Sequence, residues 1–269
     1  MTKAVREAKV YSSWINVNTH YEAAVSEFVH ALLGKMEGNL FLNDFVTSHR
    51  IIAWLGMLYG LSQTLIKLTS PGVPDTFQGT ELWDFSLVDP DNRRPVDFDR
   101  RIRSLDELGT LANQSSTSRA ATVRAMLDSM GDGRAKLFVI HQALQLRRTH
   151  PDLFQKGDYA PLWAEAPHDQ RIIAFARRFE NKGVIVVVPR LLASIIKAPG
   201  LLPLGKQIWD DARLALPWLP PDTTLIDVFG DRLLTAQRDE RGAHLALSEI
   251  LRDFPVGLIY FETVPSGST

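Results

Sequence analysis

The sequence predicts an α+β fold in which helices fill the first half and short antiparallel strands fill the last third. Before about residue 150, apolar residues recur at intervals of three and four, as on one face of a helix. Beyond residue 157, they gather in short runs rich in Val, Ile and Phe that are separated by turn residues. Because the pattern changes within 150–157, we expect two domains, 1–150 and 151–269.

Composition narrows the class of protein. The chain has 269 residues, of which 45% are hydrophobic, so it can bury a sizeable core. Its formal net charge of -1 provides no overall field for nucleic acid or a membrane surface. Cys is absent, which excludes disulfides and thiolate metal sites and fits a cytoplasmic location. No uninterrupted apolar run approaches the roughly 20 residues of a membrane span, so we expect no membrane contact.

The first third of the chain contains two predicted helices, each with one apolar face. In the first, 19–34, Thr19 is the predicted start because Glu22 follows three residues later, as in a capping box. Gly34 is the predicted end of that helix. The second, 43–68, runs up to a Ser-Pro-Gly turn sequence.

The remaining predicted elements are helices before residue 150 and strands after residue 157, in line with the spacing of their apolar residues. Two helices, 121–130 and 134–150, flank a Gly-Asp-Gly turn, and Pro151 ends the second. A hairpin is predicted between 171–179 and 184–188, because Glu-Asn-Lys-Gly joins these two apolar runs. Further strands are expected within 224–230, 243–250 and 255–261. We therefore predict a small antiparallel β-sandwich in the second domain.

The segment 68–101 passes from apolar residues into a long polar loop that is rich in Gly and Pro. A helix, a Pro-Gly turn, a short strand and a long loop make up the last unit of an α/β barrel, in which such loops build the active site. We therefore predict that 73–78 is the last strand of a (β/α)8 barrel and that the first domain is the helical end of that barrel. Its loop residues are the candidates for substrate binding.

Two motifs here carry a resemblance to a known family. The stretches PGVPDTFQGTELW (71–83) and DPDNRRPVDF (89–98) resemble the eighth strand and following loop of the α-amylase superfamily of glycoside hydrolases. Within it, the run GTELWDFSLVDPDNRRPVD resembles the maltooligosyl trehalose synthases. Segments 3–29 and 132–162 are similar to the same family, and the resemblance weakens after Leu191.

The resemblance implies an intramolecular transglycosylation in which the reducing-end α-1,4 bond of a maltooligosaccharide becomes an α,α-1,1 bond. Retaining enzymes of this type use two carboxylates about 5 Å apart, and the resemblance implies no metal or organic cofactor. In the superfamily, these carboxylates come from barrel strands four, five and seven, which would lie before Met1. We therefore expect a carboxyl-terminal fragment that has no catalytic residue of its own and is inactive alone.

The expected partners are a maltooligosaccharide and the missing amino-terminal portion of the barrel. Uncovered strand edges and apolar faces in such a fragment also predict self-association. The alternative hypothesis is a freestanding carbohydrate-binding or protein-interaction module. Nucleic-acid binding is not expected, because basic residues interleaved with aromatic ones are absent. No metal site is expected, because His141 and His150 have no second His or carboxylate at the spacing of metal ligands.

Seven residues of this loop are predicted to bind substrate. Gln78 and Glu81 end the predicted strand, and sugar contact and structural support are equally favoured for both. For Asp75, within an otherwise apolar strand, a structural carboxylate is favoured over a sugar contact. Trp83 fits either a platform for a sugar ring or core packing. The other three, in a dense turn where scaffold hydrogen bonds are favoured over a sugar contact, are Asp91, Asn92 and Arg93.

Overall fold

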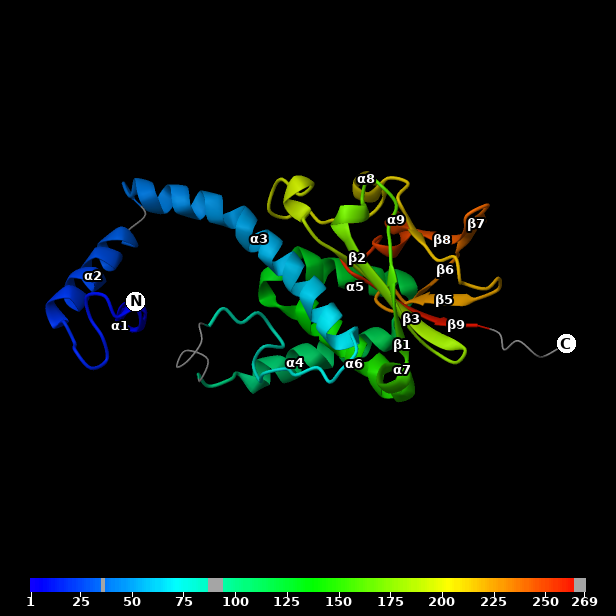
Figure 1. Cartoon of the computed structure of the whole chain (residues 1–269), viewed down its shortest axis with the longest axis horizontal. Helices are drawn as coiled ribbons and strands as arrows, with labels where there is room; N and C mark the ends of the chain where they lie inside the picture. The colour runs from blue at the N-terminus through cyan, green and yellow to red at the C-terminus, as the bar shows by residue number, and fades with distance from the viewer. Residues whose placement is uncertain (35–36, 87–93, 264–269) are drawn as a thin grey trace. The chain divides into compact units, whose positions relative to one another are not determined.

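The computed structural model describes residues 1–34, 37–86 and 94–263. The chain forms two compact units, Met1–Ala53 and Trp54–Thr269, and the second contains both β-sheets (Figure 1). Helix α3 (Leu40–Thr69) begins in the first unit and ends in the second.

In the first unit, α1 (Thr2–Ala8) and α2 (Thr19–Leu32) precede the start of α3. Asn18 caps α2, because its Oδ1 accepts a hydrogen bond from the backbone N of Tyr21 at 3.1 Å. The helix begins at Thr19, so the predicted start is confirmed, and the capping residue is the one before it. No residue of α2 is fully buried, and its apolar face is only partly covered within the part of the chain that the structure describes.

Glu22 on α2 accepts hydrogen bonds from α1 and from the segment that follows α1. Arg6 donates through Nε and Nη2 to the two carboxylate oxygens at 2.8 Å each, and Ser12 Oγ donates to Oε1 at 2.6 Å. A two-point contact between guanidinium and carboxylate is the strongest form of this pairing. These hydrogen bonds, first from Arg6 and then from Ser12, lower the pKa of the Glu22 carboxyl from 4.5 to about 2.

We expect the carboxyl ¹³C signal of Glu22 to titrate near pH 2 and not near 4.5. Because this folded pKa lies below the ordinary value, the link contributes fully to stability above pH 4.5 and is lost as the pH falls towards 2. Arg6→Ala should raise the midpoint towards 4.5, whereas Lys9→Ala, an equal loss of charge outside these bonds, should leave it unchanged. A midpoint near 4.5 in the unaltered chain would contradict this account.

The second unit contains two antiparallel sheets within the described ranges. The larger has the strand order β1-β2-β3-β9-β5-β6 and the smaller β4-β8-β7. The strands are β1 (Asp158–Leu162), β2 (Ile172–Phe179), β3 (Lys182–Pro189), β4 (Arg213–Ala215), β5 (Thr224–Asp227), β6 (Arg232–Leu234), β7 (Gln237–Asp239), β8 (Gly242–Ala246) and β9 (Gly257–Glu262). The prediction of a mixed fold with antiparallel strands is therefore confirmed, whereas the packing of the sheets as a sandwich stays a prediction.

The helices of this unit flank the sheets along the chain. They are α4 (Phe98–Gly109), α5 (Ser116–Asp128), α6 (Arg134–Thr149), α7 (Pro151–Lys156), α8 (Lys206–Trp209) and α9 (Leu247–Ile250). Short 3₁₀ turns lie at Thr110–Asn113, Met130–Asp132, Asp169–Arg171 and Leu192–Ser194. Helix α6 ends before His150, and Pro151 is the first residue of α7. This agrees with the preference of Pro for the first turn of a helix.

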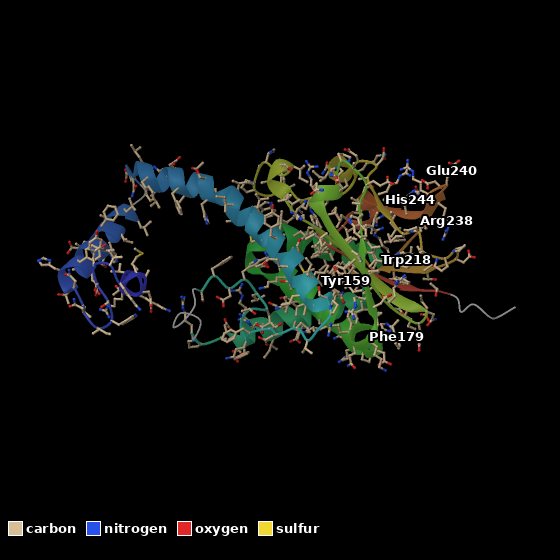
Figure 2. The ribbon with its side chains drawn as sticks, viewed as in Figure 1. Tyr159, Phe179, Trp218, Arg238, Glu240 and His244 are labelled. Atoms are coloured by element: carbon tan, nitrogen blue, oxygen red, sulfur yellow. The ribbon has the colours of Figure 1, made fainter. Side chains whose placement is uncertain are left out.

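Strand β3 lies at the centre of the core. All five Val and Ile residues in 184–188 are fully buried, as is typical of a strand covered on both faces. The carboxyl-terminal half of α3 contributes the equally buried Leu61 and Leu65. Phe138 on α6 packs with its ring centroid 5.6 Å from that of Phe229. Elsewhere in this unit lies Trp218, which is labelled in Figure 2. The centroid of its ring is 5.4 Å from that of Phe261, and the Arg178 guanidinium lies over it at 5.0 Å.

Arg177 on β2 links three further elements through backbone carbonyl groups. Its side chain is almost fully buried, with 2% exposed. The guanidinium donates to Asp158 O at 2.8 Å and to Thr69 O, the end of α3, at 3.2 Å. It also donates to Phe154 O at 3.1 Å and to Gly157 O at 2.9 Å. Burial lowers the pKa of Arg177, so these four carbonyl groups replace the water that the guanidinium loses.

The predicted barrel strand at 73–78 was wrong. These residues form an extended loop without a strand partner in the described ranges, and Val73 is 97% exposed. A strand needs a neighbour to accept and donate its backbone hydrogen bonds, and here Lys67 Nζ instead donates to Asp75 O at 2.9 Å. The assignment of this region to a barrel therefore remains a proposal.

The change from helices to strands falls between the end of α7 at Lys156 and the start of β1 at Asp158, where the sequence places it. The compact units divide elsewhere, after Ala53, and the domain pair 1–150 and 151–269 stays a prediction. Among the described residues, α3 is the one helix long and apolar enough to cross a membrane by length and composition. Its second half contributes to the core of the second unit, and a core helix meets the same criteria.

Candidate functional site

The loop between α3 and α4 borders a cavity of about 250 Å³. Amide, carboxylate and guanidinium groups share its wall with one indole ring. The lining residues are Gln78, Gly79, Trp83, Asp84, Ser86, Arg94, Pro95, Val96, Asp97 and Arg101. Such a wall offers both hydrogen-bond donors and acceptors beside an apolar surface, which is the combination that a polar organic ligand requires.

Glu81 and Arg101 fix the path of this loop. Glu81 Oε2 accepts from Arg101 Nε at 2.9 Å and from the backbone N of Gly79 at 3.0 Å. Arg101 also donates to the carbonyl oxygens of Gly79 and Asp97. Gly79 has a φ of +94°, and an added Cβ would lie 3.1 Å from Val96 Cγ2, so this turn requires glycine. The carboxylate of Glu81 therefore supports the cavity from outside its wall.

The indole of Trp83 is held in one position. Its Nε1 donates to Met130 O at 2.6 Å, and its ring lies so close to Gly60 that an added Cβ there would be 2.9 Å from Cζ3. Lys136 Nζ lies 5.6 Å from the ring centroid and donates to Leu82 O at 3.2 Å. Burial lowers the pKa of Lys136. The ring is thus a rigid part of the cavity wall.

The acidic groups of the wall are fixed by their own hydrogen bonds. Asp84 Oδ1 accepts from the backbone N of Ser86 at 2.8 Å, and hydrogen bonds from Ser86 lower the pKa of Asp84. Asp97 caps α4 by accepting from the backbone N of Arg100 at 2.9 Å. Within the described ranges, no group of three His, Cys, Asp or Glu residues is placed to hold a metal ion. The carboxylates of Asp84 and Asp97 are therefore held in place by backbone N–H groups.

The structure brings two of the predicted substrate-binding residues, Gln78 and Trp83, into the cavity wall. Glu81 lies beside it in the network with Arg101. Asp75 is exposed on the loop and outside the wall, so its expected place in an apolar, buried strand was wrong. Contact with a sugar stays a prediction for all of them. The remaining three, Asp91, Asn92 and Arg93, lie outside the described residues.

Sequence reasoning missed Arg101, Asp97 and Lys136. Asp97 carried a usable signal, because an acidic residue directly before a helical pattern is a frequent cap. The pairing of Arg101 with Glu81 spans twenty residues, and no periodicity in the sequence indicates it. Lys136 lies within the predicted helix 134–150, and no sequence pattern indicates that its amine is partly buried and donates to Leu82 O.

The known proteins that resemble this chain in sequence and those that resemble it in structure carry the same enzyme name. No protein-family model matches the sequence. Two Mycobacterium tuberculosis strains, CDC 1551 and H37Rv, have curated proteins that carry the name maltooligosyl trehalose synthase, and each is 34% identical over 238 residues. That match covers 85% of this chain and 26% of each relative.

Solved structures agree. Maltooligosyltrehalose synthase from Arthrobacter ramosus superimposes with a TM-score of 0.70 at 28% identity, over 96% of this chain and 29% of that chain. A second crystal structure, of a maltooligosyl trehalose synthase, gives a TM-score of 0.66 at 27% identity over 96% of this chain and 29% of its own. The chain is therefore similar in sequence and in fold to synthases of carbohydrate metabolism. It is homologous to one segment of maltooligosyl trehalose synthase and spans about a quarter of the length of the curated relatives. The family resemblance of the loop motifs is therefore confirmed.

Proposed function

We propose that this chain supplies part of the sugar-binding site of an enzyme that rearranges the reducing end of a maltooligosaccharide. One observation carries the proposal. The loop whose motifs resemble the synthases is also the loop that forms a polar cavity with a fixed indole wall. Homology to synthases over most of the chain supports it, because the names of these enzymes give the substrate class and the product class.

In the proposed reaction, a carboxylate of the enzyme bonds to the anomeric carbon and the α-1,4 bond at the reducing end breaks, while a second, protonated carboxyl group gives its proton to the leaving oxygen of the reducing-end glucose. The released glucose then turns, and its own anomeric hydroxyl attacks that carbon, forms the α,α-1,1 bond and gives its proton to the second carboxylate. No water is consumed. In this proposal, both reacting carboxylates lie outside the present chain, which is inactive alone.

The residues of this chain would hold the glucose during that turn. Trp83 offers a flat surface for the apolar face of the sugar, and Gln78 can both donate to and accept from its hydroxyl groups. Asp84 is an acceptor that stays ionised, because hydrogen bonds from Ser86 lower its pKa. A sugar held on several sides reaches the reacting carbon before water does.

We also propose that an amino-terminal barrel portion is the partner of the extended loop at 73–78. Exposed apolar side chains support this, since Val73 is 97%, Phe77 52% and Phe85 82% exposed. Barrel strands beside this loop would cover those side chains and would complete its backbone hydrogen bonds. The proposed location is the cytoplasm, which fits the absence of Cys. No metal or organic cofactor is part of the proposed reaction.

Maltopentaose and product chromatography test the function. This chain alone is expected to give no trehalosyl product. A chimera in which the chain replaces the homologous segment of the Mycobacterium tuberculosis relative is expected to give it, with the unaltered relative as the positive control. Turnover by the chain alone, above a buffer control and retained through repurification, would contradict the proposal.

A further inference from the structure

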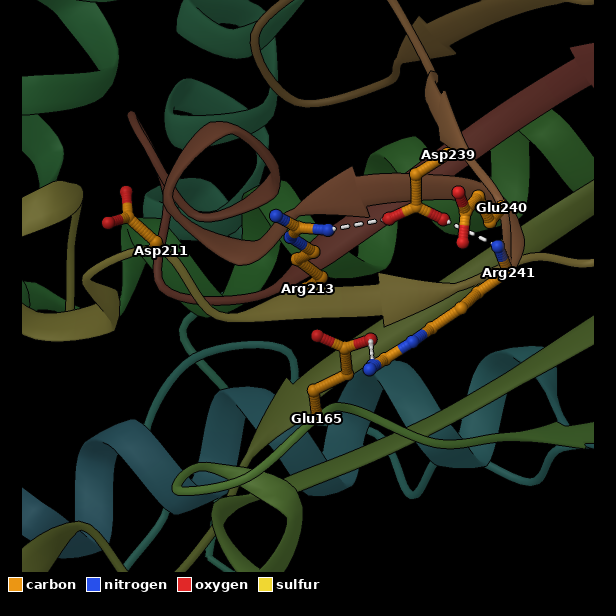
Figure 3. A pocket seen from close by; sticks show the side chains of 6 residues that line it. All are labelled: Glu165, Asp211, Arg213, Asp239, Glu240 and Arg241. Atoms are coloured by element: carbon orange, nitrogen blue, oxygen red, sulfur yellow. Dashed lines mark hydrogen bonds and ion pairs between the residues drawn. The ribbon is translucent and has the colours of Figure 1, made fainter.

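A second polar cavity, of about 590 Å³, lies on the smaller sheet (Figure 3). The β4 strand, the β7–β8 hairpin and the segment before β2 contribute to it. Its lining residues are Glu165, Asp211, Arg213, Asp239, Glu240 and Arg241. None of them belongs to the loop between α3 and α4, and the proposed reaction uses none of them.

The segment 163–165 pairs with β4 and extends the smaller sheet by one short edge. Glu165 N donates to Arg213 O at 2.9 Å, and Ala215 N donates to Trp163 O at 3.3 Å. These two bonds flank an antiparallel bridge, so Trp163 lies opposite Ala215 and Glu165 lies opposite Arg213.

Alternation along the paired strands decides which face Trp163 occupies. Ala164 and Leu214 form the bridge and are buried, with 7% and 0% exposed. Trp163 and Glu165 therefore project from the opposite face, the one that bears the cavity, at a separation of roughly 7 Å. Trp163 is 68% exposed on this face. The residue opposite it, Ala215, has only a methyl side chain, so the neighbouring strand does not cover the indole.

The charged groups of this cavity are ordered before any ligand arrives. Asp239 accepts from Arg213 Nη1 at 2.8 Å and from the backbone N of Arg241 at 2.9 Å, and the latter bond is the main reason that its pKa is lowered. Arg241 Nη1 approaches Glu165 Oε1 at 3.7 Å, which is longer than a hydrogen bond. The Glu165 carboxylate therefore keeps acceptor capacity for a ligand.

The chemistry of the lining limits what can bind. Four carboxylates and two guanidinium groups give an excess of negative charge, which disfavours phosphates and nucleic acid. Metal binding has no support, since the described residues contain no group of three metal-ligating side chains. A neutral sugar fits, because its hydroxyl groups can donate to carboxylates and accept from Arg213, while its C–H face packs on the exposed indole.

We propose that Trp163, Glu165 and the Arg213–Asp239 pair form a second, non-catalytic binding site for a neutral oligosaccharide. The choice of an α-1,4-linked glucan as ligand rests on the proposed function. The inference that the site binds a neutral sugar rests only on the residues of the site. Such a site would hold the far end of a substrate chain near the enzyme and raise its local concentration at the reacting site.

Isothermal titration of the chain with maltoheptaose tests this site. We expect saturable binding that Trp163→Ala weakens about tenfold and Glu165→Gln weakens about threefold. Trp14→Ala removes an indole that is 53% exposed in the first unit, and it should leave the affinity unchanged. Circular dichroism melting of each variant verifies that it is folded.

Absence of binding, or binding that neither Trp163→Ala nor Glu165→Gln weakens, would overturn the proposal. So would a dimer in sedimentation that Trp163→Ala converts to a monomer, since the indole would then be a protein contact. The binding result can be distinguished from the reaction, because the chimera that carries Trp163→Ala should still form trehalosyl product from maltopentaose. Loss of binding and loss of product formation are thus separate outcomes.

Discussion

Replacement of Arg177 by alanine is expected to lower the free energy of unfolding of the second unit by about 4 kcal/mol. The guanidinium donates to four backbone carbonyl groups, from α3, α7, the residue after it and the start of β1. Alanine would leave these acceptors in a region where the Arg177 side chain itself is 2% exposed, so water replaces the lost bonds poorly. The end of α3 would also lose its link to β2.

Urea unfolding monitored by circular dichroism measures this loss. Arg178→Ala is the matched control, because the neighbouring Arg178 forms a partly exposed ion pair with Asp158 at 2.7 Å. Its loss should cost about 1 kcal/mol or less. Arg177→Met keeps most of the side-chain volume, and it should remain strongly destabilised if the hydrogen bonds decide the effect. Equal stabilities of the Arg177 and Arg178 variants would refute this role.

Glu81→Ala in the chimera should lower the rate of trehalosyl product formation about a hundredfold. Glu81 accepts from Arg101 and from the backbone of Gly79, so its loss would release the loop that carries Gln78. A loosely held glucose turns more slowly, and water then competes for the reacting carbon. The share of plain hydrolysis should therefore rise together with the fall in rate.

Chromatography of the products from maltopentaose separates the trehalosyl product from the products of plain hydrolysis. Gln78→Ala should act in the same direction as Glu81→Ala, because its amide lines the cavity. Asp99→Ala removes an exposed carboxylate from the first turn of α4, outside the cavity wall, and should change neither rate nor product ratio. Unchanged rates and ratios in the Glu81 and Gln78 variants would remove both residues from the site.

Local patterns predicted the elements whose structure depends on neighbours in sequence. The periodicity of α2 and α3 gave those helices to within three residues, and the Glu-Asn-Lys-Gly signal gave the β2–β3 hairpin. The run of Val and Ile in β3 indicated a strand, whereas its full burial became apparent only in the structure, where it lies between β2 and β9. These features need only side-chain alternation and turn chemistry.

The failures concern interactions between distant residues. A strand was predicted at 73–78 from its place between a helix and a long loop, but a strand forms only where another strand pairs with it, which no local pattern reports. Glu81 and Arg101 meet because the loop folds back on α4, and Arg177 meets Thr69 across more than a hundred residues. Sequence alone therefore located the loop of the candidate site and missed the groups that hold it in place.

The central claim is that the loop at 78–101 contacts sugar in a synthase that contains this segment. A crystal structure of the chimera with a bound maltooligosaccharide tests it most directly. The account predicts a pyranose ring against the Trp83 indole and a sugar hydroxyl within hydrogen-bond distance of Gln78. A maltooligosaccharide that is fully ordered in the reacting site without any contact to residues 78–101 would contradict it.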